Sequence, residues 1–169
     1  MTDSSFAENS KKIEELDKDI QWAFVAWMNK SFGLNMPFRI IEAFRSQKRQ
    51  DELYKIGRSG IASEKPVTWT LHSMHTQRKA VDIVPLYKIE DLRHWYEQQA
   101  EIAREFRIYR PQELVALGDI GHFDGTMVES PKMHLSTKAL LEQAEKRLLR
   151  IKEPERSRLA ARIKTARSS

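Results

Sequence analysis

Cysteine is absent from this chain of 169 residues. Without thiols there can be no disulfide, no iron–sulfur cluster, no thiol nucleophile and no zinc site built on thiolates. A metal site in this protein would have to use histidine, aspartate and glutamate side chains. The sequence also lacks a glycine-rich phosphate loop, a Gly-x-Ser-x-Gly nucleophile elbow and a His-Glu-x-x-His motif. Three common enzyme classes therefore have no support in the sequence.

Long hydrophobic runs are also missing. The most apolar early segment, residues 20–28, has nine residues and is bracketed by charged ones, whereas a membrane span needs about 20. The first ten residues, MTDSSFAENS, lack the basic start, apolar middle and small-residue cleavage site of a signal peptide. We therefore expect the protein to be made in the cytoplasm and to stay there unless another protein moves it.

Charge is unevenly distributed along the chain. The net charge is +5, and residues 136–169 hold ten basic and four acidic residues, so the preceding 135 residues are close to neutral. This distribution predicts a main domain over residues 1–135 and a basic C-terminal extension over residues 136–169. Such an extension can bind nucleic acid, anionic lipid or another polyanion, or it can be a solvated helix with interspersed acidic partners. The sequence leaves these alternatives open.

Hydrophobic periodicity predicts an α+β domain with a helical C-terminal extension. An amphipathic helix is expected over residues 10–31, packed on the main domain. In the next helix, residues 46–56, Leu53 and Ile56 are expected to face inward. Further helices are expected over residues 89–108, 111–117 and from 136 onward. Strands are expected over residues 38–44, 67–71 and 80–86, and a short one within 118–125.

Two of the five histidines lie near carboxylates in the sequence. His75 is followed by Asp82, and His122 is preceded by Asp119. A catalytic zinc ion commonly has three protein ligands and an open position for water, and two histidines with one carboxylate meet that need without cysteine. A further carboxylate that does not bind the metal can accept a proton from the water. The other histidines, His72, His94 and His134, are more typical of surface or core residues.

The wider context resembles the M15 family of zinc peptidases, and most closely its phage endolysin branch, which cleaves the L-alanyl-D-glutamate bond of peptidoglycan. That branch has an Arg-Ser/Thr turn, a Gln, a Leu-Tyr pair and a Gly-Arg pair, followed by a Val-Thr strand. It then has Ser-x-His-x-x-Gly-x-Ala-x-Asp, a helix with a Trp, and Asp-x-x-His followed by an aromatic residue. The matching positions in this chain are Arg45-Ser46, Gln50, Leu53-Tyr54, Gly57-Arg58, Val67-Thr68, Ser73, His75, Ala80, Asp82, Trp95, Asp119, His122 and Phe123.

This resemblance implies a Hedgehog/D-Ala-D-Ala peptidase-like fold, with a small antiparallel sheet flanked by helices, and a role for six of the matched residues. His75, Asp82 and His122 would bind Zn²⁺, and Asp119 would be the general base. Arg45 would stabilise the oxyanion or hold a substrate carboxylate. The resemblance also implies that the hydroxyl of Ser73 supports the metal site.

Three positions depart from the family pattern or compete with it. Arg78 stands where the family usually has Gly, so the loop between His75 and Asp82 is expected to differ in shape. Asp124 stands where Glu or Gln is common. His134 is an alternative third ligand, but it lacks an acid three residues before it, and the base would then move from Asp119, for example to Glu129.

The sequence therefore predicts a zinc metallopeptidase that hydrolyses peptidoglycan stem peptides as a phage endolysin in host cell lysis. A D-Ala-D-Ala carboxypeptidase or dipeptidase of the same family is the first alternative. A non-catalytic protein that binds the envelope or nucleic acid through residues 136–169 is the second. Under the favoured interpretation the partner is peptidoglycan, the extension binds anionic lipids or polymers of the envelope, no nucleic acid is bound and the protein is a monomer.

Overall fold

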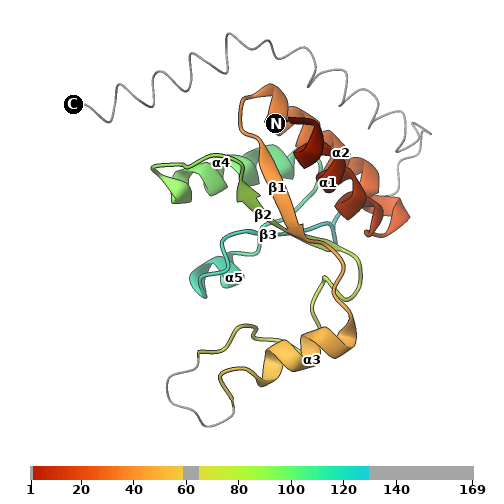
Figure 1. Ribbon diagram of the computed structural model, residues 1–169, viewed down its shortest axis with the longest axis vertical. Helices are drawn as coiled ribbons and strands as arrows, with labels where there is room; N and C mark the ends of the chain where they lie inside the picture. The colour runs from red at the N-terminus through yellow and green to blue at the C-terminus, as the bar shows by residue number, and fades with distance from the viewer. Residues whose placement is uncertain (1, 59–64, 130–169) are drawn as a thin grey trace.

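The computed structural model describes residues 2–58 and 65–129. It confirms the α+β class, with a three-stranded antiparallel sheet and several helices (Figure 1). The predicted basic extension, residues 136–169, and the alternative ligand His134 lie outside the described residues. The elements in chain order are α1 (Thr2–Glu14), α2 (Lys18–Gly33), β1 (Phe38–Glu42), α3 (Gln47–Lys55), β2 (Ala80–Pro85), α4 (Leu92–Arg104), α5 (Gln112–Ala116) and β3 (His122–Asp124).

The sheet has the order β1-β2-β3, and its two faces differ in chemistry. Side chains alternate between the faces along each strand. One face is apolar and fully buried, and it packs on α2, where the Trp27 ring lies 4.6 Å from Phe38 and 4.7 Å from Phe123 between ring centroids. The other face of β2 presents Asp82. The core therefore sits on one side of the sheet and leaves the other side available for polar chemistry.

A buried amide joins α2 and α4 inside this core. The Gln99 side chain is fully buried, and its Oε1 accepts hydrogen bonds from Trp27 Nε1 at 3.1 Å and Ser31 Oγ at 2.9 Å. Its Nε2 donates to Met36 O at 2.8 Å. A buried polar group costs stability unless it is hydrogen-bonded. These three hydrogen bonds satisfy the buried amide, so Gln99 fixes how α2 and α4 pack against each other.

The outer edge of β1 is covered by a side chain of α1. Asn9 is fully buried, and its Nδ2 donates to Phe38 O at 2.9 Å while its Oδ1 accepts from Ile40 N at 2.8 Å. One side-chain amide thus makes the pair of bonds that a neighbouring strand would make. This contact protects an edge that could otherwise pair with another chain.

The single helix expected over residues 10–31 was wrong, because the structure has two helices, α1 and α2, in its place. Asp17 caps the second helix, and its side chain accepts a hydrogen bond from the backbone N–H of Asp19. An aspartate at this position satisfies one of the free N–H groups of a new helix and so favours a start there. The hydrophobic spacing continues across the break, which is why periodicity alone concealed it.

The strand expected over residues 67–71 was also wrong. Side chains from α3 and the residues after it bind this segment instead of a partner strand. Gln47 Nε2 donates to Leu71 O at 2.9 Å, Gln50 Nε2 to Thr70 O at 2.6 Å, and Arg58 Nη2 to Thr68 O at 3.0 Å. We define this unit, α3 with residues 65–71, as the α3 lobe. Its apolar side chains are exposed, as at Trp69 (50% exposed).

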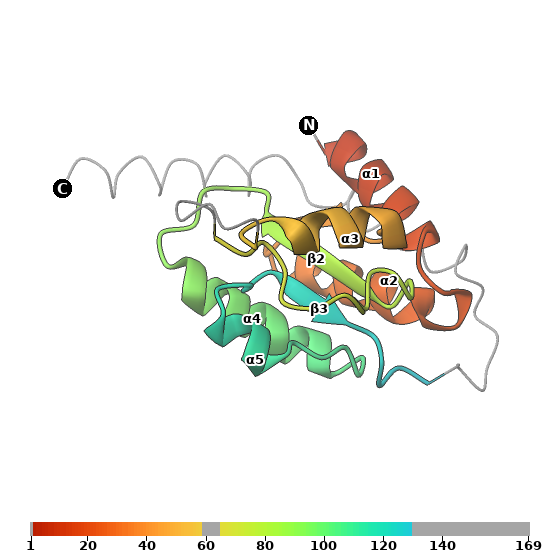
Figure 2. The same ribbon diagram turned by 90° about the horizontal axis from the view of Figure 1, so that it is seen from below.

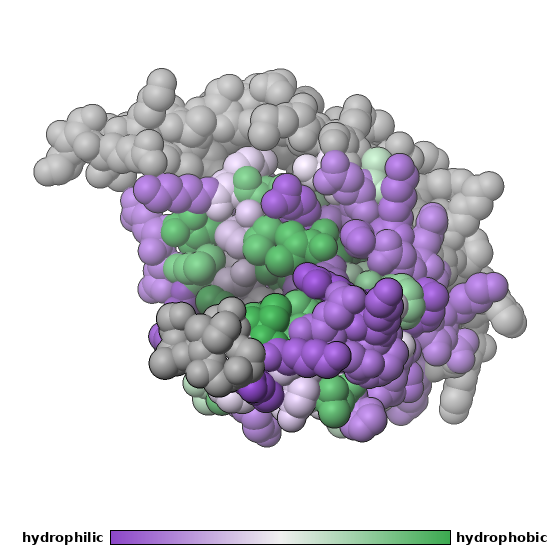
Figure 3. Space-filling view, turned by 60° about the horizontal axis from the view of Figure 1, so that its bottom comes forward, coloured by the Kyte–Doolittle hydropathy of each residue, from purple (hydrophilic) through white to green (hydrophobic). Residues whose placement is uncertain are grey.

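Figure 1 shows that α3 stands apart from α1, α2 and α4, and Figure 2 shows it from below, in front of the sheet. In both views residues 65–71 lie on the side of α3 that faces β3 and α5. Gly57 lies directly against the backbone of Lys65 and Pro66 in the lobe. Its φ is +75°, and a Cβ at this position would overlap both residues, so glycine is required here. On the face that Figure 3 presents, apolar surface gathers in patches toward the middle, and hydrophilic side chains predominate on the right.

Ile56 was expected to face inward at the end of this helix. That expectation was wrong, because Ile56 is 37% exposed. Gln50 is instead the buried residue of α3. The long helix expected over residues 89–108 is shorter, at Leu92–Arg104. Among the described residues, no helix has the length and apolar character needed to cross a membrane.

Candidate metal centre

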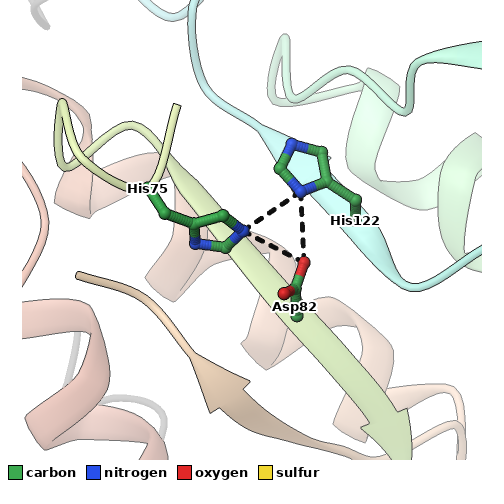
Figure 4. Close-up of side chains that lie close together, drawn as sticks. All are labelled: His75, Asp82 and His122. Atoms are coloured by element: carbon green, nitrogen blue, oxygen red, sulfur yellow. Dashed lines mark hydrogen bonds and ion pairs between the residues drawn. The ribbon is translucent and has the colours of Figure 1, made fainter. Parts of the chain in front are cut away.

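Register across the sheet brings distant polar residues into one row. Glu42 of β1 pairs with Asp82 of β2, and Asp82 pairs with His122 of β3. A bulge between Ile40 and Glu42 shifts the register of β1, so that Glu42 is the residue opposite Asp82. His75 comes from the turn that precedes β2. Figure 4 shows His75, Asp82 and His122 converging on one point from these three segments.

The three converging atoms are equally spaced. His75 Nε2 lies 3.1 Å from Asp82 Oδ1 and 3.1 Å from His122 Nδ1, and His122 Nδ1 lies 3.1 Å from the same carboxylate oxygen. Both histidines are almost fully buried, at 1% exposure for His75 and 5% for His122. The side chain of Asp82 is 19% exposed. The cluster is therefore inside the protein with access from one side.

The hydrogen bond of His75 to the backbone determines which ring nitrogen faces Asp82. Its Nδ1 lies 2.8 Å from Ala43 O, which can only accept, so Nδ1 carries the proton. In the neutral ring, Nε2 is then an acceptor that faces the carboxylate oxygen of Asp82. Two acceptors at this distance repel each other unless a proton or another cation lies between them. Orientation of one ring nitrogen by a backbone carbonyl is typical of metal-binding histidine.

The donor set suits a zinc ion. The ligand atoms of His75, Asp82 and His122 all lie within 4.8 Å of one another, and this trio could hold a metal. Nitrogen and oxygen ligands about 2.0–2.1 Å from a tetrahedral ion are roughly 3.3 Å apart, close to the observed spacing. Two imidazoles and one carboxylate are also a ligand set that leaves the fourth position open. The residues therefore fit the ion that the sequence predicts.

The electrostatics of the metal-free cluster follow from the same contacts. Burial works to raise the pKa of Asp82, but the hydrogen bonds from His122 and His75 outweigh it and hold the pKa well below its usual range. Burial works to lower the pKa of His75, but the hydrogen bond to Asp82 raises it above the ordinary histidine value. Without metal, the cluster therefore keeps a negative carboxylate and favours a proton on His75.

Metal binding should accordingly weaken as the pH falls through the raised pKa of His75. A protonated imidazole cannot bind the ion, so each proton taken up competes with it. We expect zinc affinity to be highest above neutral pH and to fall progressively on acidification, measured by chelator competition at pH 8, 7, 6 and 5.5. An affinity independent of pH over this range would contradict the assignment of His75 as a ligand.

Arg45 lies beside the cluster, held by two partners. Glu42 accepts from Nε at 2.9 Å and also from Nη2, and Gln50 Oε1 accepts from Nη1 at 2.7 Å. Nη2 also lies 3.7 Å from Asp82 Oδ2, the carboxylate oxygen that does not face the histidines. Burial works to lower the pKa of Arg45, but Glu42 raises it, so the guanidinium remains charged. A fixed cation thus stands next to the trio.

Asp119 lies just before β3 in an exposed turn. Its carboxylate makes no hydrogen bond or ion pair with the residues that the structure describes. Partial desolvation, followed by the negative charge of Asp82, raises its pKa, although His122 and His75 act in the opposite direction. An unpaired carboxylate with a raised pKa beside a metal trio suits a proton acceptor.

The backbone that carries Asp119 and His122 is held from several sides. Asp119 N donates to Leu114 O at 2.9 Å, and Gly121 O accepts from Ile83 N at 3.0 Å. Gly121 has no room for a side chain, since a Cβ would lie 2.8 Å from Ile83 O. These contacts fix the spacing between Asp119 and His122.

Arg110 also holds this turn, and sequence reasoning missed it. It is 6% exposed, and its Nε donates to Ile120 O at 3.0 Å. Its guanidinium carbon lies 5.6 Å from the centroid of the Tyr96 ring. No motif signals this residue, because its role depends on the packing of α4 against the turn.

Comparison with solved structures places this site in a known fold. A crystal structure of the L-Ala D-Glu endopeptidase ChiX from Serratia marcescens matches with a TM-score of 0.53 and 25% identity, covering 71% of this chain and 87% of that one. The chain has the fold of the M15 peptidases. A structure of VanYB in complex with D-alanine-D-alanine matches with a TM-score of 0.51 and 16% identity, covering 81% of this chain and 84% of that one. This second likeness concerns the fold alone.

Sequence comparison adds nothing to this result: no protein-family model matches the chain, and no curated protein matches it. The M15 resemblance is therefore carried by the short motifs and confirmed by the arrangement of the chain in space.

The structure also describes Ser73 and Asp124 of the M15 pattern and two histidines that were expected to be ordinary surface or core residues. Ser73 is buried, and its Oγ accepts from His75 N at 3.3 Å, so its hydroxyl contacts the backbone of a ligand residue. His72 and His94 are both exposed. The buried carboxylate of Asp124 accepts from Thr126 N at 3.1 Å and belongs to the turn after β3.

Arg78 adopts the conformation that the M15 pattern assigns to glycine, with a φ of +60°. Its side chain compensates for the strain: Nη1 donates to Glu15 O at 2.7 Å, and the guanidinium carbon lies 4.0 Å from the centroid of the Phe44 ring. The turn is left-handed with an arginine in it, and the arginine ties the turn to the segment between α1 and α2.

Arg78→Ala and Arg78→Gly should separate these two effects. Alanine removes both contacts and keeps the strained φ, so we expect it to lower the free energy of unfolding by about 1–2 kcal/mol. Glycine removes the same contacts but relieves about 1 kcal/mol of backbone strain, so it should be nearly neutral. Urea unfolding of both variants measures the difference. Equal stabilities would show that the turn is not strained.

Proposed function

We propose that this protein is a zinc-dependent peptidase that hydrolyses the L-Ala–D-Glu bond of peptidoglycan stem peptides and acts as a phage endolysin. The observation that carries the proposal is the trio of His75, Asp82 and His122 on an M15 peptidase fold, with Asp119 beside it, whose carboxylate has no hydrogen-bond partner among the described residues. The similarity to an L-Ala D-Glu endopeptidase supports the choice of bond.

The proposed chemistry is metal-assisted hydrolysis of an amide. When bound by the trio, zinc supplies a Lewis acid that polarises the scissile carbonyl and makes water acidic near neutral pH. Asp119 accepts the proton of the attacking water, and then delivers it to the nitrogen of the leaving amine. Arg45, fixed by Glu42 and Gln50, directs its free N–H groups to the oxygen on which negative charge develops.

The proposed setting is the host cell at the end of infection. The protein would be made in the host cytoplasm and would act on the cell wall once another protein has opened the inner membrane. Residues 136–169, which lie outside the described part of the chain, carry the excess of basic residues. We propose that they bind anionic lipids or polymers of the envelope.

The test is mass spectrometry of purified Gram-negative peptidoglycan after digestion with the zinc-loaded protein, with a chelated control. Free stem peptides that begin at D-Glu are the expected product. Loss of terminal D-Ala alone would move the assignment to a D-Ala-D-Ala carboxypeptidase. The absence of any zinc-dependent product would reject the peptidase proposal and favour a protein that only binds the envelope.

A further inference from the structure

We propose that Gln50 is a positioning residue that holds the Arg45 guanidinium in place and couples it to the α3 lobe. This inference rests on the proposed function, because it concerns the residue that we assign to the developing oxyanion. Gln50 is the residue of α3 that is fully buried, although the rest of that helix is largely polar and open to solvent. A buried side-chain amide needs partners, so its contacts show what it does.

Every hydrogen of the Gln50 amide is used. Its Nε2 donates to Thr68 Oγ1 at 3.0 Å and to Thr70 O at 2.6 Å, both in the α3 lobe. Its Oε1 accepts from Arg45 Nη1 at 2.7 Å. The two ends of one amide therefore join the lobe to the arginine beside the metal trio. An amide is suited to this task, since it offers donors on one atom and an acceptor on the other.

Gln50 and Glu42 hold the guanidinium at two different edges. Glu42 accepts from Nε and Nη2, and Gln50 accepts from Nη1. A guanidinium has five N–H groups, so these contacts leave one on each terminal nitrogen. Without Gln50, the orientation of the plane would depend on Glu42 and on the more distant carboxylate of Asp82, whose Oδ2 lies 3.7 Å from Nη2. With both partners, the plane and the direction of its two free N–H groups are fixed.

Packing alone does not explain why an amide side chain is buried at position 50. An apolar side chain of similar length would occupy the position without the cost of burying an amide. The amide instead accepts a charge-assisted bond from Arg45, the kind of contact that carries the most energy and direction among hydrogen bonds. Small displacements of a group that acts on the transition state can cost about 100-fold in rate.

The test compares Gln50→Met with Thr68→Val in the full-length zinc-loaded protein. Gln50→Met keeps the length of the side chain and removes all three bonds, whereas Thr68→Val removes one bond on the lobe side and leaves the contact with Arg45. We expect Gln50→Met to lower kcat by about 10- to 100-fold with little change in KM. Thr68→Val should lower kcat by less than about threefold. Zinc affinity should stay within about twofold in both variants, because neither touches the trio.

Two further measurements separate positioning from a general loss of structure. In an Arg45→Ala background, Gln50→Met should cause no additional loss of kcat, because its effect acts through the arginine. The ¹⁵N NMR signals of the Arg45 guanidinium should show restricted rotation in the wild type and in Thr68→Val, and faster rotation in Gln50→Met. The NMR measurement does not depend on turnover, so it still tests the contact if the wild type cleaves no stem peptide.

Three results would overturn the inference. The first is equal kcat for Gln50→Met and Thr68→Val at a temperature where both are folded. The second is multiplication of the Gln50→Met and Arg45→Ala effects in the double variant. The third is unchanged guanidinium rotation in Gln50→Met. Failure of the wild type to cleave peptidoglycan would reject the proposed function instead.

Discussion

Asp119→Ala should lower kcat by about 10²- to 10⁴-fold while zinc affinity changes little. The carboxylate is exposed and has no hydrogen-bond partner among the described residues, so its removal leaves no buried group unsatisfied. Its backbone N–H bond to Leu114 O is retained in the variant. The fold and the ligand trio should therefore persist, and the loss should appear in turnover alone. Rates of stem-peptide release and chelator competition measure the two properties separately.

Glu113→Ala is the matched control for this prediction. Glu113 is an exposed acid of α5, the helix just before Asp119, and it carries the same charge. We expect this variant to keep wild-type turnover, which would exclude a general effect of lost negative charge. Near-normal turnover of Asp119→Ala would mean that another group accepts the proton. Glu129, the alternative base, pairs with Arg107 in the structure and would have to leave that partner.

His75→Ala should abolish both zinc binding and turnover. The ring is 1% exposed and supplies one of three ligand atoms that lie 3.1 Å apart. Two remaining ligands bind far more weakly, so we expect the affinity for zinc to fall by more than about 100-fold. The variant also loses the bond to Ala43 O and leaves a cavity, which lowers its stability without metal.

Zinc-dependent thermal stabilisation is the measurement for this second prediction. A ligand that binds only the folded state raises the unfolding temperature, and the shift disappears when binding is lost. His94→Ala is the matched control, because the side chain of His94 is 62% exposed on α4. It should keep the zinc-dependent shift and the turnover of the wild type. A His75→Ala protein that still shows the full shift would place the zinc elsewhere.

Local sequence patterns predicted much of this molecule correctly. The α+β class, the strand before Arg45, the strand that carries Asp82 and the short helix expected over residues 46–56 all depend on neighbouring residues, and the structure has each of them. The trio was chosen from donor chemistry and from motif resemblance, and the structure brings its three members together. These features could be predicted because residue type and spacing along the chain determine them.

Two errors arose where contacts between segments outweighed a local preference. Residues 67–71 have the composition of a strand, yet Gln47, Gln50 and Arg58 bind their backbone carbonyls, and no described strand pairs with them. Ile56 was expected to face inward but is exposed, and the polar side chain of Gln50 is buried instead.

The sequence by itself determined which atoms could bind a metal, because the absence of cysteine leaves only nitrogen and oxygen ligands and the M15 motifs select three of them. Only the tertiary structure decided that Glu42 pairs with Asp82 across a bulge, that Gln50 reaches Arg45, and that Arg110 supports the turn before His122. Each of these contacts joins separate elements, and their geometry exists only after the sheet has formed and the helices have packed on it.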